Sequence, residues 1–233
     1  DHEENGLARI YPIGEQESRV NHPEQSGYFS GSCGITFYGG DAFGPEYENT
    51  VWVADVVLNL IHVDKINPEG ASLKASRVLK NRDFLASRDR SFRPVNITVG
   101  PDGGLYVADM YRQVIEHPEW IPDEIEKNLD LNAGKDKGRI YKITRAGFSA
   151  SSFNPEKLKS VAGCIESLSN PNQWVRKTAH RLLCEGNLNQ EDFGLMLNSL
   201  KSENEFVRLH AMWVLKSKGQ LNEEQIIALL NDS

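Results

Sequence analysis

The chain has 233 residues, of which 39% are hydrophobic and 25% are charged, as is typical of a globular protein with one or two domains. No run approaches the ~18 consecutive apolar residues of a membrane-spanning helix, so we expect no membrane span in this sequence. Twenty-six basic and 33 acidic side chains give a net charge of −7, and this acidic balance argues against a nucleic acid as partner.

The first part of the chain, residues 1–148, has the features of an all-β domain. It holds most of the glycines and several short runs of β-branched and aromatic residues, at 51–54, 105–108 and 139–143. Turn-forming segments rich in Gly, Pro, Asn and Asp bound these runs. Short strands with regular turns between them predict an antiparallel β architecture.

This β half also repeats itself at an interval of about fifty residues. Residues 51–55 (VWVAD) align with 105–109 (LYVAD), and the match continues from 60–61 to 114–115. Repeats of this length with several strands each predict β-propeller blades. A blade takes about 40–50 residues and a propeller about four to eight blades, so about three blades fit here. We therefore expect a partial β-propeller, the C-terminal part of a larger one.

The second part of the chain, residues 155–233, follows a linker at 149–154 and has helical periodicity. Apolar residues recur at intervals of three and four, and the motif that begins at Asn172 returns at Asn204. Cap residues before Pro and glycines at the expected ends mark the boundaries. The predicted helices lie near 155–168, 171–185, 190–201, 203–218 and 223–231, with Val175, Ala179, Leu182, Val207, Ala211 and Val214 buried.

The repeated motif N-x-x-V-R-x-x-A-x-x-x-L resembles the HEAT repeat. The resemblance implies an α-solenoid of paired helices that serves as a scaffold or as a surface for a protein partner. Arg176 and Arg208 match the repeat's usual arginine, which would bridge neighbouring repeats.

The three cysteines, Cys33, Cys164 and Cys184, include no pair with C-x-x-C spacing. An odd number without such a pair indicates neither a disulfide framework nor a zinc ribbon. We interpret all three as small buried hydrophobic residues, and we predict no metal site in this chain.

Candidate catalytic residues cluster after the second β repeat. His117 is the natural general base there, Asp109 could orient it, and Arg112 stands where the first repeat has Leu58, so blade geometry does not require it. The alternative is that Asp109 only caps a turn, which Asp55 at the equivalent position supports. A similar alternative has Arg112 pairing with Asp109 or with a nearby glutamate and merely holding the loop.

Three further residues are candidates for contact with a substrate or cofactor, namely Arg93, Tyr111 and Glu116. Arg112 could offer bidentate bonds to a carboxylate or a quinone oxygen. We expect Arg112 and His117 to lie near Arg93, facing the place of the central channel.

Several segments together resemble one family, at 32–36, 40–47, 84–95, 100–122 and 134–141. They are similar to the membrane-bound dehydrogenase propellers of planctomycetes and verrucomicrobia, which resemble the soluble quinoprotein glucose/sorbosone dehydrogenases. Residues 109–122 are the most specific part of the resemblance. Chains of that family typically run from a propeller through HEAT repeats to a c-type cytochrome domain with a C-x-x-C-H haem site.

The resemblance implies a periplasmic or otherwise extracytoplasmic oxidoreductase acting on a carbohydrate or other small molecule. The complete propeller would hold pyrroloquinoline quinone (PQQ) and calcium, and electrons would pass to haem c on a domain outside this sequence, which contains no C-x-x-C-H. This piece alone is expected to be inactive, because an axial site draws on all blades. The alternative function is a non-catalytic propeller and solenoid that binds a polysaccharide or a protein, and the absence of a downstream C-x-x-C-H would favour it.

Overall fold

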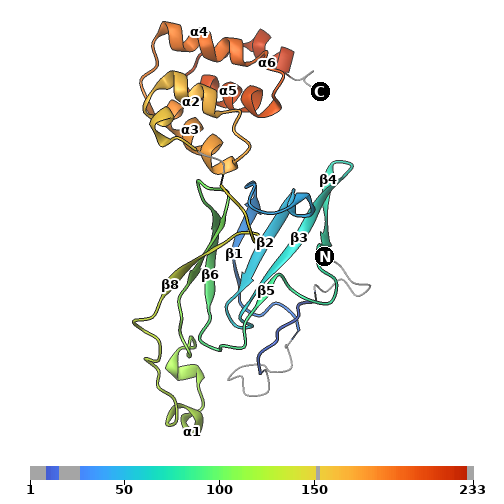
Figure 1. Cartoon of the computed structure of the whole chain (residues 1–233), viewed down its shortest axis with the longest axis vertical. Helices are drawn as coiled ribbons and strands as arrows, with labels where there is room; N and C mark the ends of the chain where they lie inside the picture. Colours follow the sequence, from blue (N-terminus) through green and yellow to red (C-terminus); the bar gives the residue numbers. More distant parts are fainter. Residues whose placement is uncertain (1–8, 16–26, 151–152, 230–233) are drawn as a thin grey trace. The chain divides into compact units, whose positions relative to one another are not determined.

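The computed structural model describes residues 9–15, 27–150 and 153–229 (Figure 1). The chain divides into two compact units. The first holds residues 1–100 and 104–149 and contains all the named strands, and the second holds 150–233 with 101–103. None of the described helices is long and apolar enough to cross a membrane.

The first sheet of the β unit is an antiparallel meander in the order β1-β2-β3-β4. A short fifth strand pairs with the start of β3, beside the place where β4 has ended. The strands are β1 (Ser32–Tyr38), β2 (Thr50–Asp55), β3 (Leu60–Glu69), β4 (Ser72–Arg77) and β5 (Leu85–Ala86).

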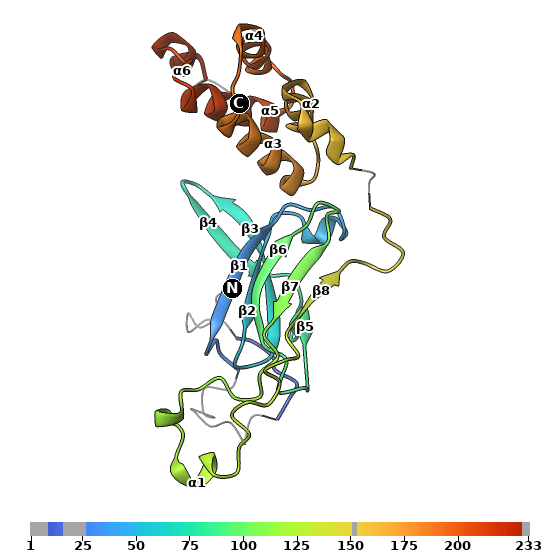
Figure 2. The ribbon, with the colours of Figure 1, turned by 90° about the vertical axis from the view of Figure 1, so that its left-hand side faces the viewer.

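The second sheet has three antiparallel strands in the order β6-β7-β8. These are β6 (Pro94–Val99), β7 (Leu105–Asp109) and β8 (Arg139–Ile143). Between β7 and β8 the chain makes a long excursion that carries a 3-10 turn, η3 (Pro118–Trp120), and one turn of helix, α1 (Asp123–Glu126) (Figure 2). The predicted match of 60–61 with 114–115 is wrong, because β8 takes the third place in this sheet and 114–115 lie in the excursion.

The two sheets pack against each other through alternate residues of their strands. Trp52 and Val63 of the first sheet share one apolar core with Ile97 and Val107 of the second, since every other side chain of a strand points to the same face. Strands β1 and β6 adjoin closely enough that a Cβ on Gly34, which has φ +59°, would lie 2.8 Å from the Cα of the facing residue in β6. The close approach of β1 to β6 at this point therefore requires a glycine.

The coarse prediction of antiparallel β-sheets followed by helices is confirmed. About three blades were expected, whereas the described part of the β half forms two sheets. Before β1, the described residues form no further strand, and the β-pairing of Arg9 is an isolated bridge to Tyr28. Residues 1–8 and 16–26 lie outside the described residues.

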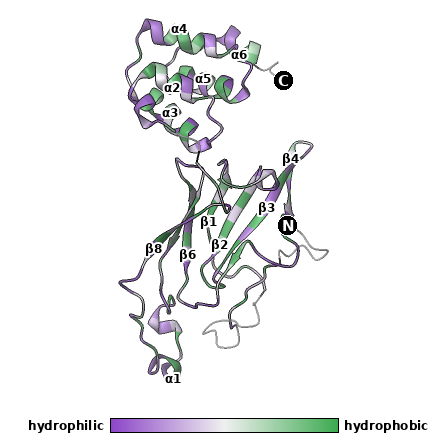
Figure 3. Ribbon diagram, in the orientation of Figure 1, coloured by the Kyte–Doolittle hydropathy of each residue, from purple (hydrophilic) through white to green (hydrophobic). Residues whose placement is uncertain are grey.

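A helix begins at or near each of the five predicted places in the second unit. The first is split into a 3-10 turn and a short helix, and the predicted end of the last lies outside the described residues. The elements are η4 (Pro155–Lys159), α2 (Val161–Ser167), α3 (Gln173–Glu185), α4 (Gln190–Ser199), α5 (Glu205–Ser217) and α6 (Glu223–Leu229). Apolar and polar residues alternate along them (Figure 3).

Helices α3 and α5 begin and pack in the same way. Asn172 and Asn204 cap them by accepting hydrogen bonds from backbone amides two residues later, each at 2.9 Å. Arg176 and Arg208 each donate from Nη1 to the carbonyls six and five residues earlier, and the Arg176 guanidinium also lies 4.0 Å from the centre of the Phe206 ring. The 32-residue sequence repeat is thus a repeat of local geometry.

The predicted core of the helical unit is largely confirmed. Four of the six predicted positions are fully buried, namely Val175, Ala179, Ala211 and Val214. Leu182 and Val207 are half-buried and pack against the same core.

Candidate functional site

Each sheet has a buried aspartate at the end of its second strand. Asp55 ends β2 and Asp109 ends β7, and neither is more than 3% exposed. Both oxygens of Asp55 are satisfied, because the turn that leads into β3 and the segment before β1 direct four amides at the carboxylate. The donors are the backbone N–H groups of Ser30, Gly31, Val57 and Leu58, at 2.8–3.0 Å.

Asp109 accepts only two amides, and both reach the same oxygen. Oδ1 accepts from the backbone N–H of Arg93 at 2.8 Å and of Tyr111 at 2.9 Å. Oδ2 is buried and has no hydrogen-bond partner in the part of the chain that the structure describes, and the Nε of Arg139 lies 4.0 Å away. Asp109 therefore caps its turn as the alternative interpretation expected, but with half of its carboxylate.

Tyr111 occupies an unusual conformation beside this carboxylate. Its φ is +50°, a left-handed value that is a genuine outlier for a bulky side chain. Its hydroxyl donates to Asp89 Oδ2 at 3.0 Å, and the Arg139 guanidinium lies 3.9 Å from its ring centre. The hydrogen bond to Asp89 raises the pKa of Tyr111. Neighbouring groups therefore hold a strained aromatic residue in place on the surface.

The return of the excursion closes over the same residue. Gly134 has φ +84°, and a Cβ there would lie 2.2 Å from the carbonyl oxygen of Tyr111. The backbone around Tyr111 is therefore packed too tightly for any larger residue at position 134.

Arg93, predicted to bind a substrate or cofactor, is buried and links the two sheets through hydrogen bonds. Only 6% of the residue is exposed. Its guanidinium donates to two carbonyls of the turn after β2 and to two of the excursion after β7. The acceptors are the carbonyls of Val56, Val57, Arg112 and Gln113, at 2.7, 3.3, 2.8 and 2.8 Å. The structure gives this guanidinium a structural role, although it does lie beside Arg112 as predicted.

The other predicted site residues are spread along the excursion. Arg112 donates from Nη1 to the carbonyl of Asn132 at 3.2 Å, and Glu116 accepts from its neighbouring amide at 3.2 Å. The side chain of His117 is 65% exposed, and its Nδ1 accepts from the amide of Glu119 at 3.4 Å. Among the described residues no hydrogen bond or ion pair joins His117 to Arg112 or to Asp109. A catalytic role for these three residues stays a prediction.

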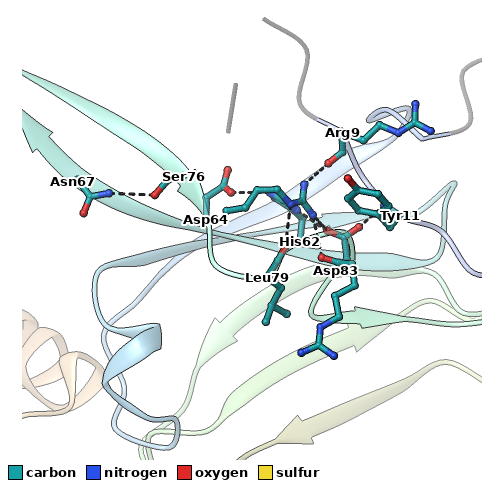
Figure 4. Close-up of polar contacts among 10 residues, drawn as sticks. Arg9, Tyr11, His62, Asp64, Asn67, Ser76, Leu79 and Asp83 are labelled. Carbon is teal, nitrogen blue, oxygen red and sulfur yellow. Dashed lines mark hydrogen bonds and ion pairs between the residues drawn. The ribbon is translucent and has the colours of Figure 1, made fainter. Parts of the chain in front are cut away.

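A second polar cluster, missed by the sequence analysis, lies on β3 and its neighbours (Figure 4). His62 is 2% exposed, with Nδ1 2.6 Å from Asp83 Oδ1 and Nε2 3.0 Å from Asp64 Oδ1. Burial lowers the pKa of His62, but the two carboxylates outweigh it, so the pKa is raised overall. Arg77 Nη2 forms an ion pair with Asp83 at 3.0 Å. When His62 is protonated, two carboxylates therefore face two cations.

This His62 cluster fastens the segment before β1 to the first sheet. Asp83 Oδ2 accepts from the backbone N–H of Tyr11 at 2.5 Å, and Arg77 Nη1 donates to the carbonyl of Arg9. Both ring nitrogens of His62 face carboxylates, so the imidazole has no position left for a substrate. We interpret the cluster as structural. The spacing of His62 and Asp64 places both on one strand face, and this was the only signal in the sequence.

The cofactors implied by the family resemblance, PQQ and calcium, were assigned to a complete propeller and stay a prediction. In the ranges that the structure describes, no group of three or more His, Cys, Asp or Glu side chains could hold a metal ion. The guanidinium of Arg93, expected to contact a substrate or cofactor, donates to backbone carbonyls. We therefore derive no chemical step through PQQ or calcium here.

These features define a two-unit α+β protein. Its first unit has two packed antiparallel sheets with a polar corner at the end of β7, and its second unit is built from helices with a repeated sequence motif. A family model described as "Domain of unknown function (DUF7133)" matches residues 1–147, and the chain belongs to this family. No curated protein and no solved structure matches the chain.

Proposed function

We propose that the two sheets are neighbouring blades of a larger β-propeller, that the helices form a HEAT-like solenoid, and that a corner at the end of β7 binds a hydroxyl-rich ligand such as a carbohydrate. We call this the Tyr111 corner and define it as Asp89, Tyr111, Arg112 and Arg139, with Asp109 beneath. Two meanders whose first strands adjoin and whose second strands end in equivalent aspartates support the blade assignment.

The observation that carries the proposal is the strained backbone of Tyr111. Left-handed conformations of non-glycine residues persist only where surrounding contacts impose them, and they concentrate at functional sites. Here Asp109 directs the amide, Asp89 binds the hydroxyl and Arg139 covers one ring face. The turn after β2 also contains a left-handed residue, but there it is Asn59, with φ +57°, a residue type that adopts this conformation far more readily than tyrosine. The fold therefore does not require an aromatic residue in this conformation.

The chemistry of the corner suits a polyol. A carboxylate accepts hydrogen bonds from hydroxyl groups, guanidinium groups donate hydrogen bonds to hydroxyl oxygens, and an aromatic ring packs against the apolar face of a sugar. Asp89, Arg112 and Arg139 supply these groups around the tyrosine, and the side chain of Arg139 is 40% exposed. A ligand can reach them without displacing the buried Asp109.

A second candidate function is oxidation of the bound ligand in a longer parent protein. The family resemblance of residues 109–122 favours it, as does the exposure of His117, which would accept a hydroxyl proton. Under this candidate the parent is extracytoplasmic, and its electron acceptor and haem c lie outside the described residues.

The test is a panel of sugars and polyols titrated onto the chain by calorimetry. We expect saturable binding that Asp89→Asn and Tyr111→Gly weaken at least about tenfold, because each removes a direct contact. Tyr141→Phe is the matched control, because this tyrosine of β8 lies outside the corner. Binding by no member of the panel, or equal binding by all variants, would overturn the proposal.

The same panel separates the two candidates. The longer parent is assayed with the sugar that binds and an artificial electron acceptor. Turnover that His117→Ala abolishes, with binding retained, supports the oxidoreductase. Binding without turnover supports the non-catalytic module.

A further inference from the structure

The helical unit places a thiol against an imidazole. Cys184 lies near the end of α3 and is partly exposed, with its Sγ 3.5 Å from Nε2 of His180, one helical turn earlier. The hydroxyl of Ser217, on α5, lies 3.4 Å from the same sulfur. The His180 ring stands 5.1 Å from the ring of His210 on α5. A nucleophile, a base and a hydroxyl therefore meet where the ends of α3 and α5 approach.

The other two cysteines are held in a different state. Burial raises the pKa of Cys164, whose thiol donates to a backbone carbonyl at 3.4 Å. Burial and then the charge of Asp55 raise the pKa of Cys33, whose thiol donates to the carbonyl of Pro94 at 3.3 Å. Because the thiolate is the nucleophile, these environments keep both sulfurs unreactive. All three cysteines are free, and Cys184 alone contacts a side-chain base.

His180 Nε2 lies where it can accept a proton from the thiol, and burial makes the ring neutral but a weaker base than a free imidazole. Burial lowers the pKa of His180, and burial together with the nearby His180 lowers that of His210 to about 4, so both rings are neutral at pH 7. If Nε2 of His180 accepts from the thiol, Nδ1 must carry the ring hydrogen. That Nδ1 is buried, and none of the described residues offers it a hydrogen-bond partner.

A cation also lies at the C-terminal end of α3, the end that carries Cys184. Lys218 donates from Nζ to the carbonyl of Gly186 at 2.7 Å, two residues beyond Cys184. A fixed ammonium at this place favours a reagent that carries a carboxylate.

We propose that Cys184 is the reactive thiol of this chain and that it takes up a small, preferably anionic, organic disulfide by thiol–disulfide exchange. The thiol gives its proton to His180 Nε2 as Sγ attacks one sulfur of the disulfide. A new S–S bond forms at Cys184 while the old S–S bond breaks, and the departing thiolate takes the proton back from His180. Cys184 is oxidised to a mixed disulfide, and the other half of the reagent is reduced to a thiol.

The adduct would change the joint between two helices. Ser217 contacts Cys184. Leu183, next to Cys184 in α3, and Val214 of α5 both belong to the buried core of the helical unit. A bulky group on the sulfur has to displace Ser217 and strain this packing. Exchange at Cys184 would therefore loosen the contact of α3 with α5 reversibly.

The test follows release of the coloured thiolate from 5,5′-dithiobis(2-nitrobenzoate), a dianionic disulfide, by the folded chain. We expect one fast equivalent that Cys33→Ser and Cys164→Ser retain and Cys184→Ser loses. His180→Asn should slow the fast phase at pH 7 by about tenfold or more, and less at high pH, where the thiol ionises unaided. His210→Asn is the matched control, since that ring does not contact the sulfur.

A neutral disulfide, 4,4′-dithiodipyridine, isolates the effect of charge. Lys218→Met should slow the anionic reagent more than the neutral one, and equal slowing would refute the anionic preference. If Cys184→Ser does not fold, the parent chain is quenched after the fast phase and the adduct is mapped by mass spectrometry. An adduct on Cys33 or Cys164, or a rate that His180→Asn leaves at the level of the His210→Asn control, overturns the proposal.

Discussion

The turns after β2 and β7 start from the same element and end differently. Each begins with a buried aspartate at the end of the second strand. After β2 the chain turns at once into β3, and Asp55 receives four amides. After β7 the chain leaves on an excursion, and Asp109 receives two. The short, closed turn and the segment before β1 together satisfy both oxygens of Asp55, whereas in the open turn one oxygen of Asp109 binds the amide of the left-handed Tyr111 and the other accepts no hydrogen bond from the described residues.

The largest expected effect is the loss of the closed turn. Asp55→Ala removes the acceptor of four amides and should destabilise the β unit by about 4 kcal/mol, because unsatisfied buried donors are costly. Asp109→Ala removes the acceptor of two and should lower stability by about 2 kcal/mol. Urea unfolding followed by circular dichroism measures both. Equal effects, or a larger effect at Asp109, would break the comparison.

The tight return of the open turn can be tested at Gly134. Gly134→Ala should destabilise the unit by about 2 kcal/mol, since the new Cβ meets the Tyr111 carbonyl in a left-handed backbone. Gly70→Ala is the control, because Gly70, in the turn between β3 and β4, also has positive φ but nothing within 4 Å of its Cβ position. It should cost about 1 kcal/mol, from backbone strain alone. If both alanines cost the same, the excursion does not pack tightly on Tyr111.

Features with a local cause could be predicted from the sequence. The strands at 51–54 and 105–108 follow from runs of β-branched and aromatic residues with turn-forming residues within a few positions. The helices beginning after Asn172 and Asn204 follow from a cap residue and a 3.6-residue period. Such signals lie within one turn or one strand of the element that they predict.

Features made by distant partners could not be predicted. Arg93 was expected to bind a ligand, but its acceptors are backbone carbonyls, which every sequence offers equally. His62 meets Asp83 across a loop whose path the strand pattern does not fix. The third strand of the second sheet was misplaced because a short repeat match does not reveal an insertion between its halves.

The first sheet should respond to pH through His62. Its folded-state pKa is raised by Asp64 and Asp83, so its stabilising effect is fully present below the unfolded pKa of about 6.5 and is lost as pH rises through the folded value. We expect the unfolding free energy to fall above that pH relative to a His62→Gln chain, in which this dependence is absent. Unfolding curves from pH 5.5 to 8.5 test this, with His117→Gln as the exposed control. Parallel pH profiles for the His62→Gln chain and the parent would show that the pKa of His62 is the same in the folded and unfolded states, and would refute the raised pKa.

The smallest expected effect on stability is at Tyr111 itself. Tyr111→Gly removes solvent-exposed contacts to Asp89 and Arg139, and it relieves a left-handed backbone that costs an aromatic residue about 1–2 kcal/mol. Because glycine also raises the entropy of the unfolded chain by roughly 0.5–1 kcal/mol, the net change should stay within about 0.5 kcal/mol. Trp52→Gly, a deletion in the shared core, should cost several-fold more. A loss at Tyr111 approaching that of the core variant would mean that the ring supports the fold and that its strain serves packing. A near-neutral effect leaves the ring available for the ligand, because the excursion then holds a side chain in strain that folding does not need.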